Sequence, residues 1–234
     1  MKRYAFIYSQ ILQIYRAMDT ISFPIEPCRI IDMIDNCRSM SYQQFAGMNQ
    51  CSVEQVIQFC KSKSGCTHYD TENDRYLILW NEDGAGYNVP GRRRWTKAHE
   101  LGHVVLRHFP LTAEAQLAEH GLYTITAPEY ETEADCFAAT LLSPMPLFDM
   151  LKIRSPVDIR YVFGLSTEAS NYRWDEYARW KRTRRKASWE NDFRAVILDR
   201  QGTGKLTVPG LRAANCERSR GAISIWKDPE EEDV

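Results

Sequence analysis

The fold of this chain is decided around residues 95–108, which read Trp-Thr-Lys-Ala-His-Glu-Leu-Gly-His-Val-Val-Leu-Arg-His. On an α-helix, residues four apart lie on one face, so the imidazoles of His99 and His103 can point at a single metal ion. Glu100 follows the first histidine and can reach a water molecule beside that ion as a general base. The opposite side of the helix is apolar and can pack on a core through Ala98, Leu101, Val104 and Val105.

A catalytic zinc ion needs a third protein ligand, with its fourth position left to water. The extended form of this motif would supply a histidine at position 109, where the chain has Phe109, and would have glycine in place of Leu106. His108 is predicted to point away from the ligand face. His120 falls on a stretch predicted to be an irregular loop and is the weaker histidine candidate.

The better candidates for the third ligand lie at residues 131–139, which read Glu-Thr-Glu-Ala-Asp-Cys-Phe-Ala-Ala on a second predicted helix. Glu131 and Asp135 are four apart. Glu131 can therefore bind the metal while Asp135 accepts the outer N–H of a ligand imidazole and fixes its tautomer. Glu133 points about 200° away from Glu131, by two steps of about 100° on an ideal helix. Glu133 is the alternative third ligand if the helix begins later than predicted.

The composition is that of a globular protein, with 44% hydrophobic and 26% charged residues among 234 and a net charge of −1. This balance provides no overall field that would draw the chain to nucleic acid or to an anionic membrane. No apolar stretch approaches the roughly 18 residues of a membrane span, and no signal peptide is predicted. Seven cysteines without a Cys-x-x-Cys pair indicate reduced, mostly buried thiols in a cytoplasmic protein, and their irregular spacing disfavours a cysteine zinc site.

The apolar pattern predicts a mostly helical chain with few strands. Helices are expected at 4–18, 29–37, twice within 41–59, through the metal motif as far as Pro110, and at 129–142, 147–153, 156–163 and 166–186. Strands are expected at 75–80, 193–198 and 222–226, of which the last two can pair. The remaining stretches are predicted to be turn-like at 62–74, irregular at 111–128 and an acidic tail at 228–233.

Two stretches carry a weak nucleic-acid signal. The helices within 41–59 could form a helix-turn-helix, but the basic residues of a recognition helix are missing there. Residues 179–186 are basic, as suits the C-terminus of a helix on dipole grounds. Direct nucleic-acid binding is therefore not expected.

The order of several motifs resembles the ImmA/IrrE metallopeptidases over about residues 20–180. These motifs are the segment 97–108, the segment 131–144 that ends in Ser-Pro, an apolar strand ending at Asn81, and Phe-Gly-Leu-Ser at 163–166 followed by Ala169 and Arg173. Ser143 stands where the family often has methionine, and residues 187–234 lie outside the resemblance.

The resemblance implies a compact, zincin-like α+β fold, mostly helical with a small sheet. It implies His99 and His103 as zinc ligands, Glu100 as the base and the Glu131 segment as the source of the third ligand. The resemblance also implies a regulatory protein as substrate, because family members often act on repressors encoded by mobile elements or in stress responses. The expected division of the chain is an N-terminal helical part at 1–70, a metallopeptidase core at 71–186 and a C-terminal extension at 187–234.

The expected function is therefore cleavage of a regulatory protein, a helix-turn-helix repressor, by a zinc-bound water with Glu100 as general base. Candidates for a second oxyanion donor are Tyr123, Tyr130 and His108. The alternative is a binding protein, an anti-repressor or toxin–antitoxin partner, that keeps the metal fold without cleaving. Intact Glu100 favours the enzyme, because a structural zinc site has no use for a base beside its ligands.

Overall fold

The computed structural model describes residues 3–83, 90–109, 122–123, 128–183 and 188–200. Within them lies a four-stranded sheet of order β1-β3-β2-β4. Strand β1 (Cys37–Ser41) runs parallel to β3 (Arg75–Trp80), which pairs antiparallel with β2 (Gly65–Asp70). The short β4 (Leu122–Tyr123) pairs antiparallel with the C-terminal end of β2, at Tyr69 and Asp70.

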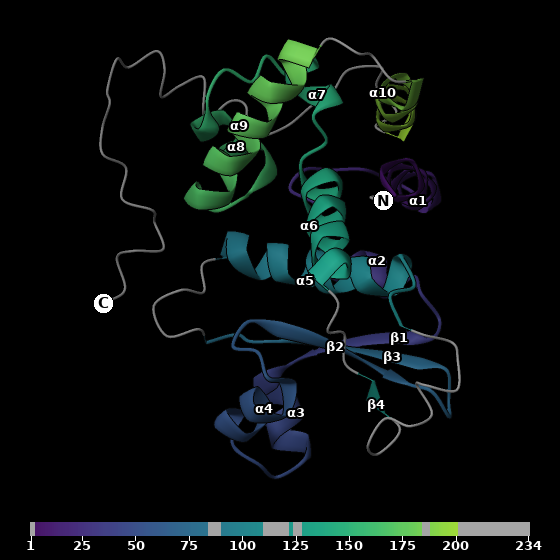
Figure 1. The fold of residues 1–234 in the computed structure, drawn as a ribbon, viewed down its shortest axis with the longest axis vertical. Coiled ribbons are helices and arrows are strands. Elements are labelled where there is room, and N and C mark those ends of the chain that lie inside the picture. The colour runs from purple at the N-terminus through teal and green to yellow at the C-terminus, as the bar shows by residue number, and fades with distance from the viewer. Residues whose placement is uncertain (1–2, 84–89, 110–121, 124–127, 184–187, 201–234) are drawn as a thin grey trace.

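Helices surround this sheet. In Figure 1 the long helix α5 (Pro90–Val105) lies above the sheet, α6 (Pro128–Leu142) crosses above α5, and α3 (Tyr42–Met48) and α4 (Val53–Cys60) lie below. The other helices are α1 (Tyr4–Ala17), α2 (Pro27–Ile31), α7 (Pro146–Met150), α8 (Pro156–Phe163), α9 (Thr167–Thr183) and α10 (Ser188–Arg200). The expected α+β fold, mostly helical with a small sheet, is confirmed.

The two faces of the sheet belong to two hydrophobic clusters, because successive side chains of a strand point to opposite faces. Ile78 of β3 joins the main core, which includes α5, α6 and α1. Its neighbour Leu79 joins a smaller cluster with Tyr42 of α3 and with Val56 of α4. The sheet thus separates the α5–α6 side from the α3–α4 side.

Helices α5 and α6 approach each other closely at Gly102. A Cβ atom at this position would lie 3.0 Å from Cδ1 of Phe137 and 3.3 Å from Cα of Ala134. The absence of a side chain lets α6 pack directly on α5, which brings the two helices that carry the motifs within reach of each other.

Several sequence expectations are confirmed by this architecture. The helices at 4–18, 129–142 and 156–163, the strand at 75–80 and the two helices within 41–59 are all present. A capping box forms at the start of α4, where Ser52 Oγ accepts from Gln55 N–H at 3.2 Å and Gln55 Oε1 accepts from Ser52 N–H at 2.8 Å.

Other expectations are wrong. Residues 193–198 form part of helix α10 and not a strand. Residues 62–74, expected to be turn-like, contain β2, and the helix predicted at 29–37 ends early and gives way to β1. The predicted strand at 222–226 and the acidic tail at 228–233 lie outside the described residues.

Strand pairing and core packing both cross the boundaries expected between the N-terminal part, the metallopeptidase core and the C-terminal extension. Strands β2 and β3 pair across residues 70 and 71, and Phe193 of α10 is fully buried in the main core with Ile7 of α1. Among the described residues, none of the helices has the length and hydropathy needed to cross a membrane.

Candidate metal centre

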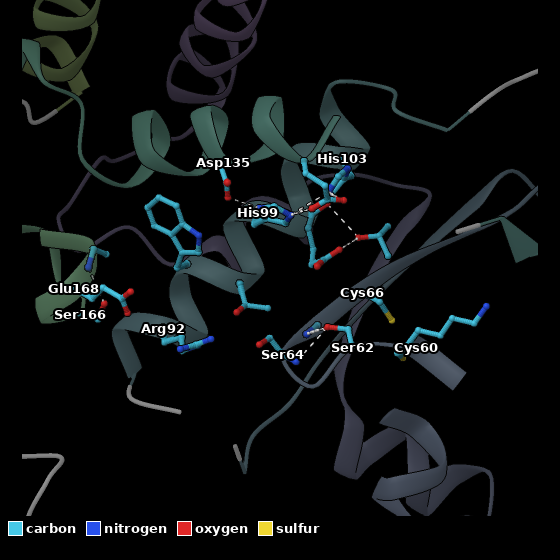
Figure 2. Close-up of a pocket in the computed structure, with 18 of the residues that line it drawn as sticks. Cys60, Ser62, Ser64, Cys66, Arg92, His99, His103, Asp135, Ser166 and Glu168 are labelled. Atoms are coloured by element: carbon cyan, nitrogen blue, oxygen red, sulfur yellow. Dashed lines mark hydrogen bonds and ion pairs between the residues drawn. The ribbon is translucent and has the colours of Figure 1, made fainter. Parts of the chain in front are cut away.

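The two histidines of the motif converge on one point. His99 and His103 lie one turn apart on α5, and their Nε2 atoms are 3.1 Å from each other. Figure 2 shows both imidazoles on the side of α5 that faces α6. His103 is 2% exposed, so this point lies at the buried end of the site.

Glu131 of α6 completes a group of three donors. Its Oε2 atom is 3.1 Å from His99 Nε2, and its Oε1 atom is 3.6 Å from His103 Nε2. Tetrahedral zinc with ligand bonds of about 2.0–2.1 Å holds its donor atoms about 3.3 Å apart. The three donors therefore have the separations and the chemistry that a zinc ion requires.

Each imidazole is held by its outer nitrogen. His99 Nδ1 is 2.9 Å from Asp135 Oδ1, and His103 Nδ1 is 2.9 Å from His108 Nδ1. Such partners fix the tautomer that leaves Nε2 free to bind a metal. On the His103 side, Nδ1–H donates to His108 Nδ1, so His108 must carry its own proton on Nε2.

Glu133 lies apart from the three donors. Its Oε2 atom accepts from His108 Nε2 at 3.2 Å and from Nε of Arg3 at 3.0 Å. These bonds, opposed by burial, lower the pKa of Glu133. The structure thus places the alternative ligand in a chain of contacts that runs from His103 through His108 and Glu133 to Arg3.

Glu100 is buried beside the donors, with only 8% of its surface exposed. Burial raises the pKa of its carboxyl to about 6. The hydroxyl of Thr67 on β2 donates to Glu100 Oε2 at 2.7 Å, and this bond opposes the rise. The result is a carboxylate with a pKa suited to accepting a proton near neutral pH.

The pKa of His99 shows that the point between His99, His103 and Glu131 favours positive charge. Burial alone would lower the pKa of His99, but hydrogen bonds to Asp135 and Glu131 and the charge of Glu100 raise it to about 10. Burial and the neighbouring imidazoles of His99 and His108 lower the pKa of His103 to about 2. His103 is therefore neutral, and His99 holds a proton that a metal ion would replace, because the carboxylates favour positive charge at this point.

A cavity of about 810 Å³ opens over the three donors. Its wall includes Trp95 and Arg92 of α5 and Glu168 and Tyr172 of α9. Figure 2 shows Asp135 and His99 at the top of this pocket, with Arg92 and Glu168 to one side. The donors are thus reachable from outside and are not sealed in the core.

Sequence reasoning missed two residues of this site. Thr67 was hidden because β2 was not recognised, and His108 was predicted to point away although the chain turns after α5 at Arg107, where φ is 55°. His108 has both ring nitrogens engaged, so it offers no free N–H as an oxyanion donor in this arrangement, and the ring of Tyr130 stacks on it at 4.5 Å.

Two further sequence candidates cannot be placed at the site. His120 and the side chain of Tyr123 both lie outside the described part of the chain.

Comparison with known families agrees with this geometry. The sequence model of the IrrE N-terminal-like domain, a peptidase family, matches residues 56–175, just over half of the 234 residues. The match spans β2, Glu100, the two motif histidines and Glu131. No curated protein matches the chain significantly. With both the matched domain and a histidine–glutamate cluster able to hold a metal, the chain belongs to the IrrE N-terminal-like family and is a metallopeptidase.

Proposed function

We propose that this protein is a zinc-dependent peptidase that cleaves a regulatory protein, a helix-turn-helix repressor. The observation that carries the proposal is the convergence of His99, His103 and Glu131, whose donor atoms all lie within 4.8 Å of one another, beside the buried carboxyl of Glu100. Two imidazoles and one carboxylate are a set that suits zinc, and they leave one coordination position open.

The catalytic role belongs to Glu100. A bound zinc ion would supply Lewis acidity, which activates water and polarises the peptide carbonyl. Glu100 accepts the proton of the attacking water and returns it to the amine that leaves. Thr67 holds one carboxylate oxygen and so fixes the direction in which the other can accept. Asp135 and His108 keep the two imidazoles in the orientation that binding needs.

The family supports a protein substrate, and the resemblance to ImmA/IrrE enzymes narrows the proposal to a repressor. The cavity leaves room for an extended peptide segment between the donors and the start of α9. Peptide cleavage requires such access on both sides of the bond that breaks.

Replacement of Glu100 tests this function. Glu100→Gln keeps shape, fold and metal, because the amide is nearly isosteric and Glu100 is not among the three donors. It removes the base, and general-base assistance is worth about 10²–10⁴-fold in rate. In cells that express tagged repressors from neighbouring genes, fragments should appear with the wild type and disappear with Glu100→Gln.

Two additional variants sharpen this experiment. Glu129→Gln changes an exposed carboxylate on the same helix as Glu131 and should leave the fragments unchanged. His103→Ala should lose both metal and fragments. If Glu100→Gln relieves repression as well as the wild type and neither yields a fragment, the protein acts by docking and the peptidase proposal fails.

A further inference from the structure

A second group of metal-binding side chains lies on the other side of β2 from Glu100. Cys60 is the last residue of α4, and Cys66 and His68 stand on β2. His68 Nε2 is 3.4 Å from the sulfur of Cys66 and 4.0 Å from the sulfur of Cys60. All three ligand atoms lie within 4.8 Å of one another.

The fold brings these three side chains together, although their spacing in the sequence does not indicate a metal site. Cys66 and His68 are two apart on a strand, so both point to the same face. Thr67 between them points to the opposite face, toward Glu100. The turn after α4 then returns the chain into β2 and sets Cys60 beside them. The grouping needs no Cys-x-x-Cys pair.

The group is buried and only partly satisfied. Cys60 is 3% exposed, Cys66 6% and His68 3%. Phe59 covers the imidazole, with ring centroids 4.6 Å apart. His68 Nδ1 is buried without a hydrogen-bond partner among the described residues. With the ring proton on this nitrogen, the lone pair of Nε2 is directed at the two sulfurs.

The spacing of the three atoms fits a bound cation. Zinc with bonds of about 2.3 Å to sulfur and about 2.0 Å to nitrogen would hold sulfur and nitrogen about 3.5 Å apart in a tetrahedral site. The observed 3.4 and 4.0 Å lie on either side of this value. The two sulfurs adjoin Nε2 alone, so the tautomer with its proton on Nδ1 offers the Nε2 lone pair to a cation held between them.

We propose that Cys60, Cys66 and His68 form a second metal site, for a thiophilic cation, either Zn²⁺ or Cu⁺. Two thiolates and one imidazole are the ligands that both ions prefer. On binding, each thiol loses its proton to solvent and forms a sulfur–metal bond, and no redox change is required. Cys60 and Cys66 are also among the residues that line the cavity over the first centre.

A disulfide between Cys60 and Cys66 is the competing interpretation. It would use both sulfurs but would leave His68 Nε2 without a thiol or a cation as its partner. A cation uses all three groups at once, and the geometry therefore favours it. Bound there, it would also hold β2 in place and, through Thr67, the carboxyl of Glu100 on the other face.

The full-length protein with His99→Ala/His103→Ala isolates the second site. After removal of metal under reducing conditions, it should take up about one equivalent of Zn²⁺ or of Cu⁺. Zn²⁺ is measured by elemental analysis and Cu⁺ by competition with a coloured chelator, so the two arms identify the ion. Co²⁺ used as a spectroscopic probe should give thiolate-to-metal charge-transfer absorption in the near ultraviolet.

Cys60→Ser/Cys66→Ser in the same background should abolish uptake and the charge-transfer band, whereas Cys28→Ser/Cys51→Ser should retain both. In the otherwise wild-type chain, Cys60→Ser/Cys66→Ser should still bind one metal at the first centre, which shows that it is folded. Two results would overturn the proposal. One is a folded His99→Ala/His103→Ala protein that binds neither ion, and the other is a Cys60–Cys66 disulfide in protein alkylated at the moment of cell lysis.

Discussion

At the scale of single residues, His108 is a positioning residue for His103. It is 2% exposed and lies between His103 Nδ1 and Glu133. His108→Gln should weaken zinc affinity about 10–100-fold without removing a ligand, as is typical of such outer partners. Competition with a zinc chelator measures this affinity. Asp135→Asn, which perturbs the partner of His99, provides the matched comparison, and an unchanged affinity in both would refute the role given to these contacts.

Thr67 affects the pKa of the general base, Glu100. Glu100 must be ionised to accept a proton, so activity should rise with pH through its pKa, which burial raises to about 6. The Thr67 hydroxyl lowers that pKa. Thr67→Val removes the hydroxyl with little change of shape, and the acid limb of the pH–rate profile should move to higher pH. Thr67→Ser should restore it. A profile that is the same for all three proteins would show that the hydrogen bond does not govern the base.

Helical spacing explains which site residues the sequence could predict. His99, His103, Glu131 and Asp135 are read from four-residue intervals, because each pair lies on one helix. Thr67 comes from a strand more than thirty positions earlier, and no local interval relates it to Glu100. Contacts between elements depend on how the elements pack, which the sequence pattern around either residue does not encode.

At the scale of elements, the site depends on the close approach of α5 and α6. Gly102→Val would place side-chain atoms against Phe137 and Ala134, where even a Cβ would lie 3.0 Å from the ring. Overpacking of this kind costs about 1–3 kcal/mol. Both the melting temperature and the zinc affinity should fall, because Glu131 moves away with α6. Gly47→Ala on α3 meets nothing within 4 Å and should not destabilise the protein.

The errors in predicting elements have a physical origin. Residues 193–198 are mostly apolar, and a short apolar run does not distinguish strand from helix. Phe193 and Ile197 are both fully buried and four apart, which is the spacing of a helix face. Strand β2 is not recognised from the sequence because it contains polar residues and therefore lacks an apolar run. Its Thr67 and His68 are polar but buried, because they contact Glu100 and the thiols instead of solvent.

At the scale of the whole molecule, the core extends beyond the family domain. The matched region ends at residue 175, yet Phe193 of α10 contacts Tyr15 of α1 edge-on, and Trp189 stacks on Tyr8 at 4.0 Å. Truncation after Thr183 should therefore destabilise the protein by at least about 3 kcal/mol, the cost of losing large buried side chains. Chemical denaturation measures the loss. Truncation after Arg200 retains these contacts, and if both forms unfold alike, α10 is an appendage.

Because α1 packs on α6, the first helix of the chain has to wait during synthesis until α6 has been made. Tyr15 donates its hydroxyl to the carbonyl oxygen of Leu141, 126 residues later, and α6 contributes apolar side chains to the core in which α1 lies. At synthesis rates of about 5–20 residues per second, the ribosome needs roughly 6–25 s to make the partner. Throughout that interval Ile7 and Ile11, fully buried in the finished protein, lack the part of their native surroundings that α6 provides. The nascent chain thus exposes this apolar segment for seconds before it can fold, and we expect chaperones that hold such segments during translation to bind it.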